Sequence, residues 1–184
     1  SAGILRTFLL ILYCTGLRLG EAVRLQLSDV NLNTREFFIQ ESKGRARLVP
    51  FRKDLAQEIT TYLKERKSIA KTNEQIVVDT LFVNLCGNSL TTNAVSCAIV
   101  QLLRQQGLKP AKGRVGPRPF DFRHAFAVHR LTEWYHQGVD IHARLPWLSA
   151  YMGHANVLGT EVYLHATPEL LQVASDRFES RLRH

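Results

Sequence analysis

The amino-acid sequence predicts a mainly α fold with a small antiparallel β-sheet (α+β). Apolar residues recur at three- and four-residue intervals through most of the chain, which is the period of an amphipathic helix. Only residues 34–51 contain two β-rich runs separated by turn residues. The chain has 184 residues, 45% of them hydrophobic, so it can bury one core of good size. We therefore predict a single domain over residues 1–184.

The first half of the chain contains helices on either side of a hairpin. The expected elements are, in order, a helix ending near Tyr13, a helix over residues 19–27, strands over 34–40 and 45–51, and a helix over 53–70. Thr15-Gly16 interrupts the first helical pattern, so Arg18 lies at the break. The residues between the two strands, Glu41 to Gly44, form the expected turn, which carries Lys43.

The second half is almost entirely helical. The expected elements are a strand-like piece over 80–84, a turn at 86–88, a helix from Thr91 or Thr92 to Gln106, a loop over 107–119, and helices over 120–133, 145–152 and 168–182. Gly153 ends the helix before it, because glycine adopts the left-handed conformation at least cost, and His154 then lies in the exit turn. Thr160 is a plausible N-cap for a short helix that carries Tyr163.

The charge balance points to an anionic partner. Lys and Arg number 24 against 16 Asp and Glu, a formal net charge of +8, which is the footprint of nucleic-acid binding, although ribosome-bound and membrane-surface proteins share it. The apolar run over residues 4–13 is too short to span a bilayer and lacks the pattern of a signal peptide. Three cysteines without paired spacing, Cys14, Cys86 and Cys97, favour buried thiols in a reducing compartment. We therefore expect a cytoplasmic protein without membrane contact.

Five residues have the chemistry for metal-free phosphoryl transfer. The sequence has no HExxH, no Cys-and-His metal pattern, no Walker-type motif and no Asp-rich cluster, so a metal-dependent nuclease is disfavoured and no metal or other cofactor is expected. The guanidinium groups of Arg18 and Arg123 can each hold phosphate oxygens through paired donors. Tyr163 could attack the phosphorus if cations and His154 favour its phenolate, and Lys43 could protonate the leaving alcohol. Each residue alone also has an ordinary structural interpretation as part of a helix or turn.

Four segments in order resemble the motifs of the tyrosine recombinases of the phage-integrase family. They are TGLRLGEAVRLQLSDV, ESKGRARLVPF, FDFRHAFAVHRL and LPWLSAYMGHANVLGTEVYLH. The resemblance covers nearly the whole chain and implies a tyrosine recombinase catalytic-domain fold. It implies Arg18 and Arg123 as catalytic arginines, Lys43 as general acid, His154 as the later histidine and Tyr163 as nucleophile. Glu21 matches an acidic residue of the family, with a role more structural than chemical.

The resemblance also implies what the protein does and with which partners. A tyrosine recombinase of this family cuts one DNA strand through a 3′-phosphotyrosine and rejoins it to another 5′-hydroxyl, with neither metal nor ATP. The family acts as a tetramer on two DNA duplexes, with a carboxy-terminal segment passed to a neighbouring protomer, for which residues 167–178 are the candidate. We expect the chain to be a catalytic-domain fragment without the family's amino-terminal DNA-clamping domain.

Basic residues outside the five are candidates for DNA contact. The residues expected to bind DNA are Arg45, Arg47, Arg114, Arg118 and His124. The wider group in and before the loop over 107–119, namely Arg104, Lys109, Lys112, Arg114 and Arg118, fits either a solvated face or contact with the DNA backbone.

One position departs from the family pattern. Phe120 stands where the family usually has a histidine three residues before the second arginine, and a phenyl ring can neither bond a phosphate oxygen nor accept a proton. His124 matches another family position but points about 100° round the helix from Arg123. Two alternatives therefore remain open: a DNA-binding or regulatory homologue that has lost efficient cleavage, and a type IB topoisomerase, which cuts DNA in the same way but acts as a monomer.

Overall fold

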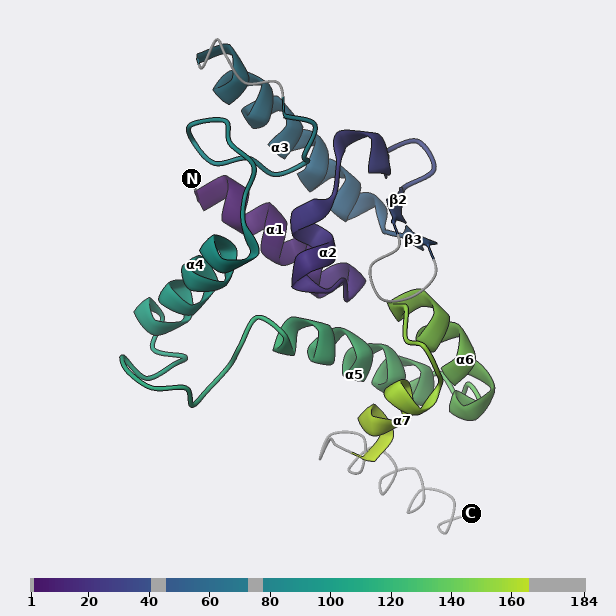
Figure 1. Cartoon of the computed structure of the whole chain (residues 1–184). Helices are drawn as coiled ribbons and strands as arrows, with labels where there is room; N and C mark the ends of the chain where they lie inside the picture. Colours follow the sequence, from purple (N-terminus) through teal and green to yellow (C-terminus); the bar gives the residue numbers. More distant parts are fainter. Residues whose placement is uncertain (1, 41–45, 73–77, 166–184) are drawn as a thin grey trace.

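The computed structural model of the chain describes residues 2–40, 46–72 and 78–165 (Figure 1). It confirms the mainly helical class with one small antiparallel sheet. The elements are α1 (Ala2–Thr15), α2 (Leu19–Arg24), a 3-10 turn (Leu27–Asp29), β1 (Val30–Asn31), β2 (Glu36–Ile39), β3 (Arg47–Pro50), α3 (Lys53–Thr72), α4 (Thr92–Gln105), α5 (Asp121–His136), α6 (Ile141–Met152) and α7 (Leu158–His165).

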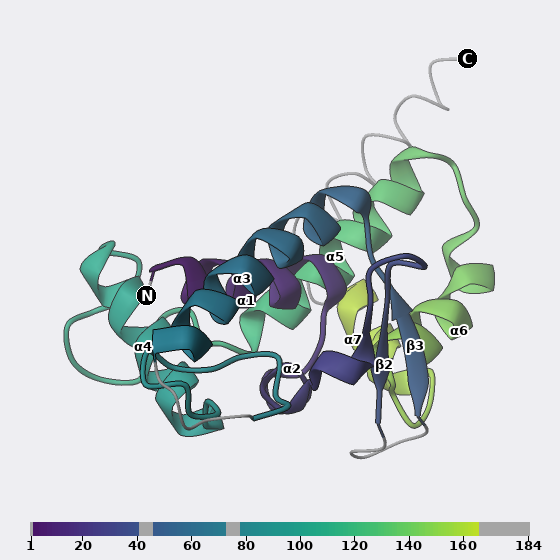
Figure 2. The same ribbon diagram turned by 90° about the horizontal axis from the view of Figure 1, so that it is seen from above.

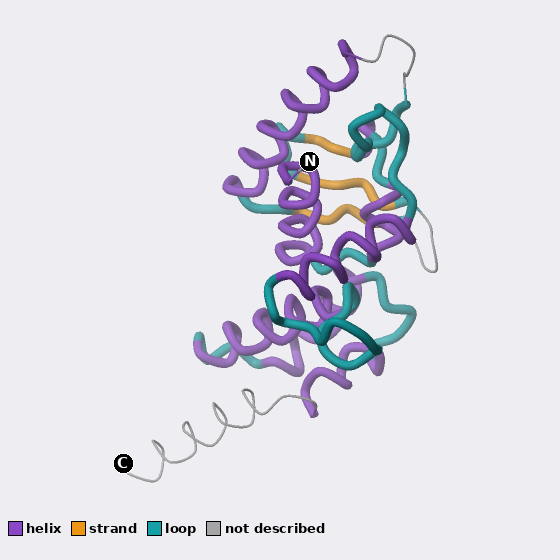
Figure 3. Tube along the Cα trace, turned by 90° about the vertical axis from the view of Figure 1, so that its left-hand side faces the viewer, coloured by secondary structure: helices purple, strands orange, loops and turns teal. Residues whose placement is uncertain are grey.

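The sheet has three antiparallel strands in the order β1-β2-β3, which lie side by side in Figure 3. Phe37 of β2 faces Val49 of β3, and both side chains are fully buried. The neighbouring pair, Phe38 and Leu48, is exposed. This alternation fixes the register, because a slip by one residue would turn the buried pair to solvent. The sequence analysis missed β1, which is only two residues long.

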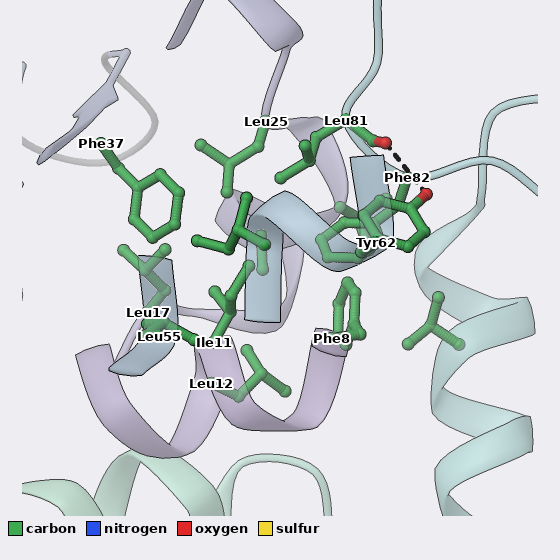
Figure 4. Close-up of a cluster of buried hydrophobic side chains, with 14 of the residues drawn as sticks. Phe8, Ile11, Leu12, Leu17, Leu25, Phe37, Leu55, Tyr62, Leu81 and Phe82 are labelled. Carbon is green, nitrogen blue, oxygen red and sulfur yellow. Dashed lines mark hydrogen bonds between the residues drawn. The ribbon is translucent and has the colours of Figure 1, made fainter. Parts of the chain in front are cut away.

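The first hydrophobic core lies between α1, α3 and the sheet. Figure 4 shows its centre, where Tyr62 of α3 packs beside Phe82 with ring centroids 5.0 Å apart. The Tyr62 hydroxyl donates to the carbonyl of Leu81 at 3.0 Å, and Arg66 donates to the same carbonyl. The strand-like piece expected over 80–84 therefore lies outside the sheet and is held by α3 side chains, by two isolated bridges and by a backbone hydrogen bond from Leu81 to Leu25.

The second core is formed by α5, α6 and α7, with Leu131, Leu145 and Tyr163 among its buried residues. The two cores meet where α5 packs against the end of α1. Gly16 has a φ of 63°, and a Cβ there would lie 2.5 Å from Cδ1 of Phe126. Glycine is thus required at this contact both by its backbone conformation and by the close approach of α5.

Several expected helix ends were wrong. Helix α2 ends at Arg24, and α6 begins at Ile141 because the Asp140 side chain caps it by accepting from the amide of Ala143. Thr160 is not an N-cap, because α7 begins two residues earlier. The residue that bonds a first-turn amide of α7 is Asn156, whose side chain accepts from Gly159.

The expectation of buried thiols was also wrong, because all three cysteines are exposed. The last expected helix, over residues 168–182, lies outside the described residues. In the part of the chain that the structure describes, none of the helices combines the length and the apolar character needed to cross a membrane.

Candidate active site

Three arginines from three different elements converge on the carboxyl end of α6, and we call this arrangement the arginine clamp. Each donates to a different one of three successive carbonyls, and Figure 2 shows α6 beside the sheet that supplies one of them. The bonds are Arg47 Nε to the Tyr151 carbonyl (2.9 Å), Arg123 Nη2 to the Met152 carbonyl (2.8 Å) and Arg18 Nη2 to the Gly153 carbonyl (2.9 Å).

The end of α6 is well suited to receive cations. The last carbonyls of a helix have no intrahelical partner and lie at the negative end of its dipole. Gly153 ends the helix with φ 68° and ψ 45°, in the left-handed region expected from the sequence. A Cβ at Gly153 would lie 2.6 Å from Nη1 of Arg47, so a larger residue would displace that arginine.

Glu21 fixes two members of the clamp. Its carboxylate accepts from Arg18 Nη1 at 2.9 Å and from Arg47 Nη1 and Nη2 at 3.1 and 3.0 Å, and its side chain is only 1% exposed. Burial alone would raise the pKa of Glu21, but the hydrogen bonds from Arg47 and Arg18 outweigh it and lower the pKa to about 2. The carboxylate therefore stays ionised and sets the orientation of two guanidinium groups.

Arg123 is buried at the junction of the two cores. It lies on the first turn of α5, as expected, and its Nη1 donates to the Gly16 carbonyl at 2.6 Å. Burial, together with the nearby charge of Arg18, lowers its pKa to about 10, so it remains a cation at neutral pH. Two of its five N–H groups hold the backbone carbonyls, which leaves donors for an anion.

His154 follows Gly153 directly and is held by α7. Its Nδ1 lies 2.7 Å from Oγ1 of Thr160, a fully buried hydroxyl. Burial lowers its pKa to about 4, and the charges of Arg123, Arg18 and Arg47 act in the same direction. The imidazole is therefore neutral at pH 7.

Tyr163 is 5% exposed and lies between two imidazole rings. The ring centroid of His154 is 6.3 Å away at an interplanar angle of 21°, and that of His124 is 5.1 Å away at 59°. The Tyr163 hydroxyl makes no hydrogen bond to the residues that the structure describes. His124 contacts Tyr163 because α7 packs against α5. The angle between His124 and Arg123 on their helix could not predict this tertiary contact.

The structure thus brings together four of the five residues proposed for chemistry: Arg18, Arg123, His154 and Tyr163. Lys43 and the expected DNA contact Arg45 lie outside the described residues. Arg47, also expected to bind DNA, has a side chain that is 13% exposed and held by Glu21, so its DNA contact remains a prediction.

Sequence reasoning missed three roles: Arg47 in the clamp, Thr160 on His154, and His124 beside the tyrosine. For Arg47, the sequence indicated only that it lies on a strand of the predicted hairpin. Thr160 and His124 carried no local signal for these contacts.

Comparison with known proteins finds relatives of one family. The model of the phage integrase family matches residues 3–169. The integrase/recombinase y4rB of Sinorhizobium fredii is 38% identical over 172 residues, which are 93% of this chain and 54% of that protein. Tyrosine recombinase XerC of Lacticaseibacillus casei is 31% identical over 162 residues, 88% of this chain and 50% of that protein.

Solved structures show the same fold. The crystal structure of XerA recombinase matches with a TM-score of 0.73 at 22% identity, covering 97% of this chain and 64% of that one. The Tn1549 transposon integrase in complex with transposon right end DNA matches with a TM-score of 0.68 at 20% identity, covering 93% and 57%.

The helical fold with its three-stranded sheet is that of a tyrosine recombinase catalytic domain. The chain belongs to the phage integrase family. It spans about half the length of the curated relatives it matches.

Proposed function

We propose that this chain is the catalytic part of a site-specific DNA recombinase or integrase. Its partner is double-stranded DNA, which it cuts and rejoins through a tyrosine, without metal or ATP. The observation that carries the proposal is the position of Tyr163, buried between two imidazoles on the helix that packs against the buried Arg123.

In the first step, a DNA phosphodiester lies against the outer donors of Arg18 and Arg123. The Tyr163 oxygen attacks the phosphorus while the bond from phosphorus to the 5′ oxygen breaks, so one ester bond replaces another. The two guanidinium groups offset the charge that builds up on the phosphate oxygens. Because the phosphate is retained as an ester, rejoining needs no outside energy source.

The proton transfers fall to the neighbouring side chains. His154 is neutral at pH 7 and can hold a phosphate oxygen through Nε2–H, since its Nδ1 is engaged by Thr160. His124 lies close enough to the tyrosine ring to be considered as its proton acceptor. Lys43, which follows β2 in the sequence, supplies the proton to the leaving 5′ oxygen in this proposal.

Assembly and location follow from the same activity. We propose that the protein acts as a tetramer on two duplexes, through a carboxy-terminal segment that includes residues 167–178, and that it works on DNA in the cytoplasm. The XerH recombinase, of similar fold, was crystallised with its palindromic difH substrate in a post-cleavage complex. That segment of the present chain lies outside the described residues.

A suicide substrate tests the proposal. The full-length protein should form a covalent complex with a nicked duplex that carries the end sequence of its own genetic element. Tyr163→Phe should abolish this complex and keep DNA binding, because it removes the nucleophile but little packing. The matched control is Tyr151→Phe, which removes a hydroxyl that donates to the Pro50 carbonyl at 3.0 Å and should leave the covalent complex intact.

Three results would redirect the assignment. Binding without any covalent complex in the wild type would favour the regulatory homologue. Relaxation of supercoiled DNA with no product joined across two duplexes would favour a type IB topoisomerase. An adduct that persists in the Tyr163→Phe variant would place the nucleophile elsewhere.

A further inference from the structure

One lysine of the loop between α4 and α5 does not face solvent. We call residues 107–119 the basic loop. Lys109 is 6% exposed, and its ammonium donates to three backbone carbonyls, those of Arg114 (3.4 Å), Val115 (2.7 Å) and Gly116 (3.3 Å). The part of the sequence expected to be a plain solvated face or a set of DNA contacts therefore contains a cation committed to the protein's own backbone.

A second cation holds the loop from the side of α4. Arg104, in the last turn of that helix, donates from Nε to the Pro110 carbonyl at 3.2 Å and from Nη2 to the Gly113 carbonyl at 3.4 Å. Gly113 and Gly116 both have φ of 89°, a conformation that other residues rarely adopt. The chain thus curls around two cations, with five of its carbonyl oxygens turned toward them.

The consequence appears on the outer surface of the loop. Lys112, Arg114 and Arg118 are exposed, and Arg118 has a long ion pair of 3.7 Å with Asp121. Two apolar side chains of the same loop are also exposed, Val115 (77%) and Leu108 (62%). The basic loop therefore offers positive charge and apolar groups to solvent, while five of its carbonyls are bound to cations.

A surface with exposed cations and exposed apolar side chains is suited to binding DNA. Burying an ammonium is costly unless it is fully hydrogen-bonded, and three carbonyls compensate Lys109 here. Exposed cations hold phosphates in register, and apolar side chains contact sugars and thymine methyl groups. The loop leads directly into α5 (Figure 1), and Arg123 lies on the first turn of that helix.

We propose that the basic loop is a preformed DNA-contacting surface beside the cleavage site, and that Lys109 is its positioning residue and not a DNA contact. The inference rests on the proposed function, because it takes DNA as the ligand. Arg114 and Val115 form the part that meets the duplex, since the ammonium of Lys109 holds the carbonyls of these two residues.

The test compares two lysines of the same loop in the full-length protein. Lys109→Met and Lys112→Met remove the same charge, one buried and one exposed. Binding to a labelled duplex with the cleavage site and to an unrelated duplex is measured by fluorescence anisotropy at several salt concentrations. Lys112→Met should weaken both duplexes alike and reduce the salt slope by about one. Lys109→Met should weaken binding to the site duplex about tenfold or more, and this loss of affinity should persist at high salt.

A double-mutant cycle separates positioning from contact. Arg114→Ala should weaken binding of the site duplex about tenfold, and adding Lys109→Met should cost little more, because the first change already removes what the lysine positions. Without DNA, hydrogen exchange at the amides of residues 113–117 should accelerate in Lys109→Met but not in Lys112→Met.

Three outcomes overturn the proposal. Losses that multiply in the double variant would show that Lys109 touches DNA itself. Unchanged hydrogen exchange in Lys109→Met would remove its positioning role. Wild-type affinity in Arg114→Ala would show that the loop is not a DNA surface. The covalent complex of Tyr163 is scored separately, so failure of this inference and failure of the proposed function are distinguishable.

Discussion

Replacing Phe120 by histidine should accelerate DNA cleavage and leave the protein folded. Phe120 stands three residues before Arg123, so the two positions lie on one face of the helix start. The phenyl ring supplies no donor to a phosphate and no acceptor for the tyrosine proton. An imidazole at that position would add one such group to a site that already holds Arg18, Arg123 and His154.

The structure sets the size of both effects. Sequence analysis left open whether the Phe120 ring is buried, and it is 58% exposed. Full burial of such a side chain stabilises by about 1.5–3 kcal/mol, so the loss on substitution is about 1 kcal/mol at most. Removing one preorganised donor from a transition state costs about 10²–10³ in rate, which is the upper limit of the gain. Phe120→His should therefore accelerate cleavage strongly while it lowers the free energy of unfolding only slightly.

The assay is single-turnover cleavage of a suicide substrate at saturating enzyme, with thermal unfolding recorded in parallel. Phe120→Ala is the control, because it removes the exposed ring and adds no imidazole, and it should not accelerate cleavage. If Phe120→His melts normally but cleaves no faster, another group already fills the role. His124, 5.1 Å from the Tyr163 ring, is the first candidate, and His124→Gln should then abolish cleavage in the wild type.

Three further substitutions test the remaining contacts. Arg123→Lys should slow single-turnover cleavage at least about a hundredfold, because one ammonium cannot hold two backbone carbonyls and a phosphate together; a wild-type rate would make the arginine purely structural. Glu21→Gln should lower the free energy of unfolding by about 3 kcal/mol at pH 7. Because the folded pKa of Glu21 is lowered from 4.5 to about 2, its contribution is complete above pH 4.5 and is lost as the pH falls toward 2. Urea unfolding over this range should show the two proteins converging, and a constant gap would contradict the pKa. Thr160→Val, which keeps the shape but removes the hydroxyl on His154, should lower cleavage about tenfold with unchanged DNA affinity, and equal rates would show that the hydrogen bond does not orient the imidazole.

The sequence was sufficient for most of the fold because its signals are local. Helical spacing of apolar residues predicted the helices, and the residues around Gly44 predicted the hairpin. The glycine at 153 predicted the end of α6, and the structure places it in the left-handed conformation. The sequence missed β1, which has only two residues, and the strand-like piece expected over 80–84 makes only isolated bridges outside the sheet.

The site was only half predictable, for a physical reason. Residue types suited to phosphate chemistry predicted a role for Arg18, Arg123, His154 and Tyr163, which the structure brings together, but the backbone acceptors of the arginines left no trace in the sequence. Arg47 donates to the carbonyl of Tyr151, 104 positions later, and any residue at position 151 would offer the same oxygen. Contacts made by the backbone depend on how α6 meets β3, which only the tertiary structure shows.

In the arginine clamp, substitutions can remove the side-chain donors but not the backbone acceptors. Substituting any of its three arginines removes a donor, whereas substituting Tyr151 or Met152 leaves each carbonyl where it was. Gly153 is the exception, because a Cβ there would strike Arg47. Laboratory evolution could therefore refit the outward side chains of α6 to a new partner while the three guanidinium groups keep their anchor.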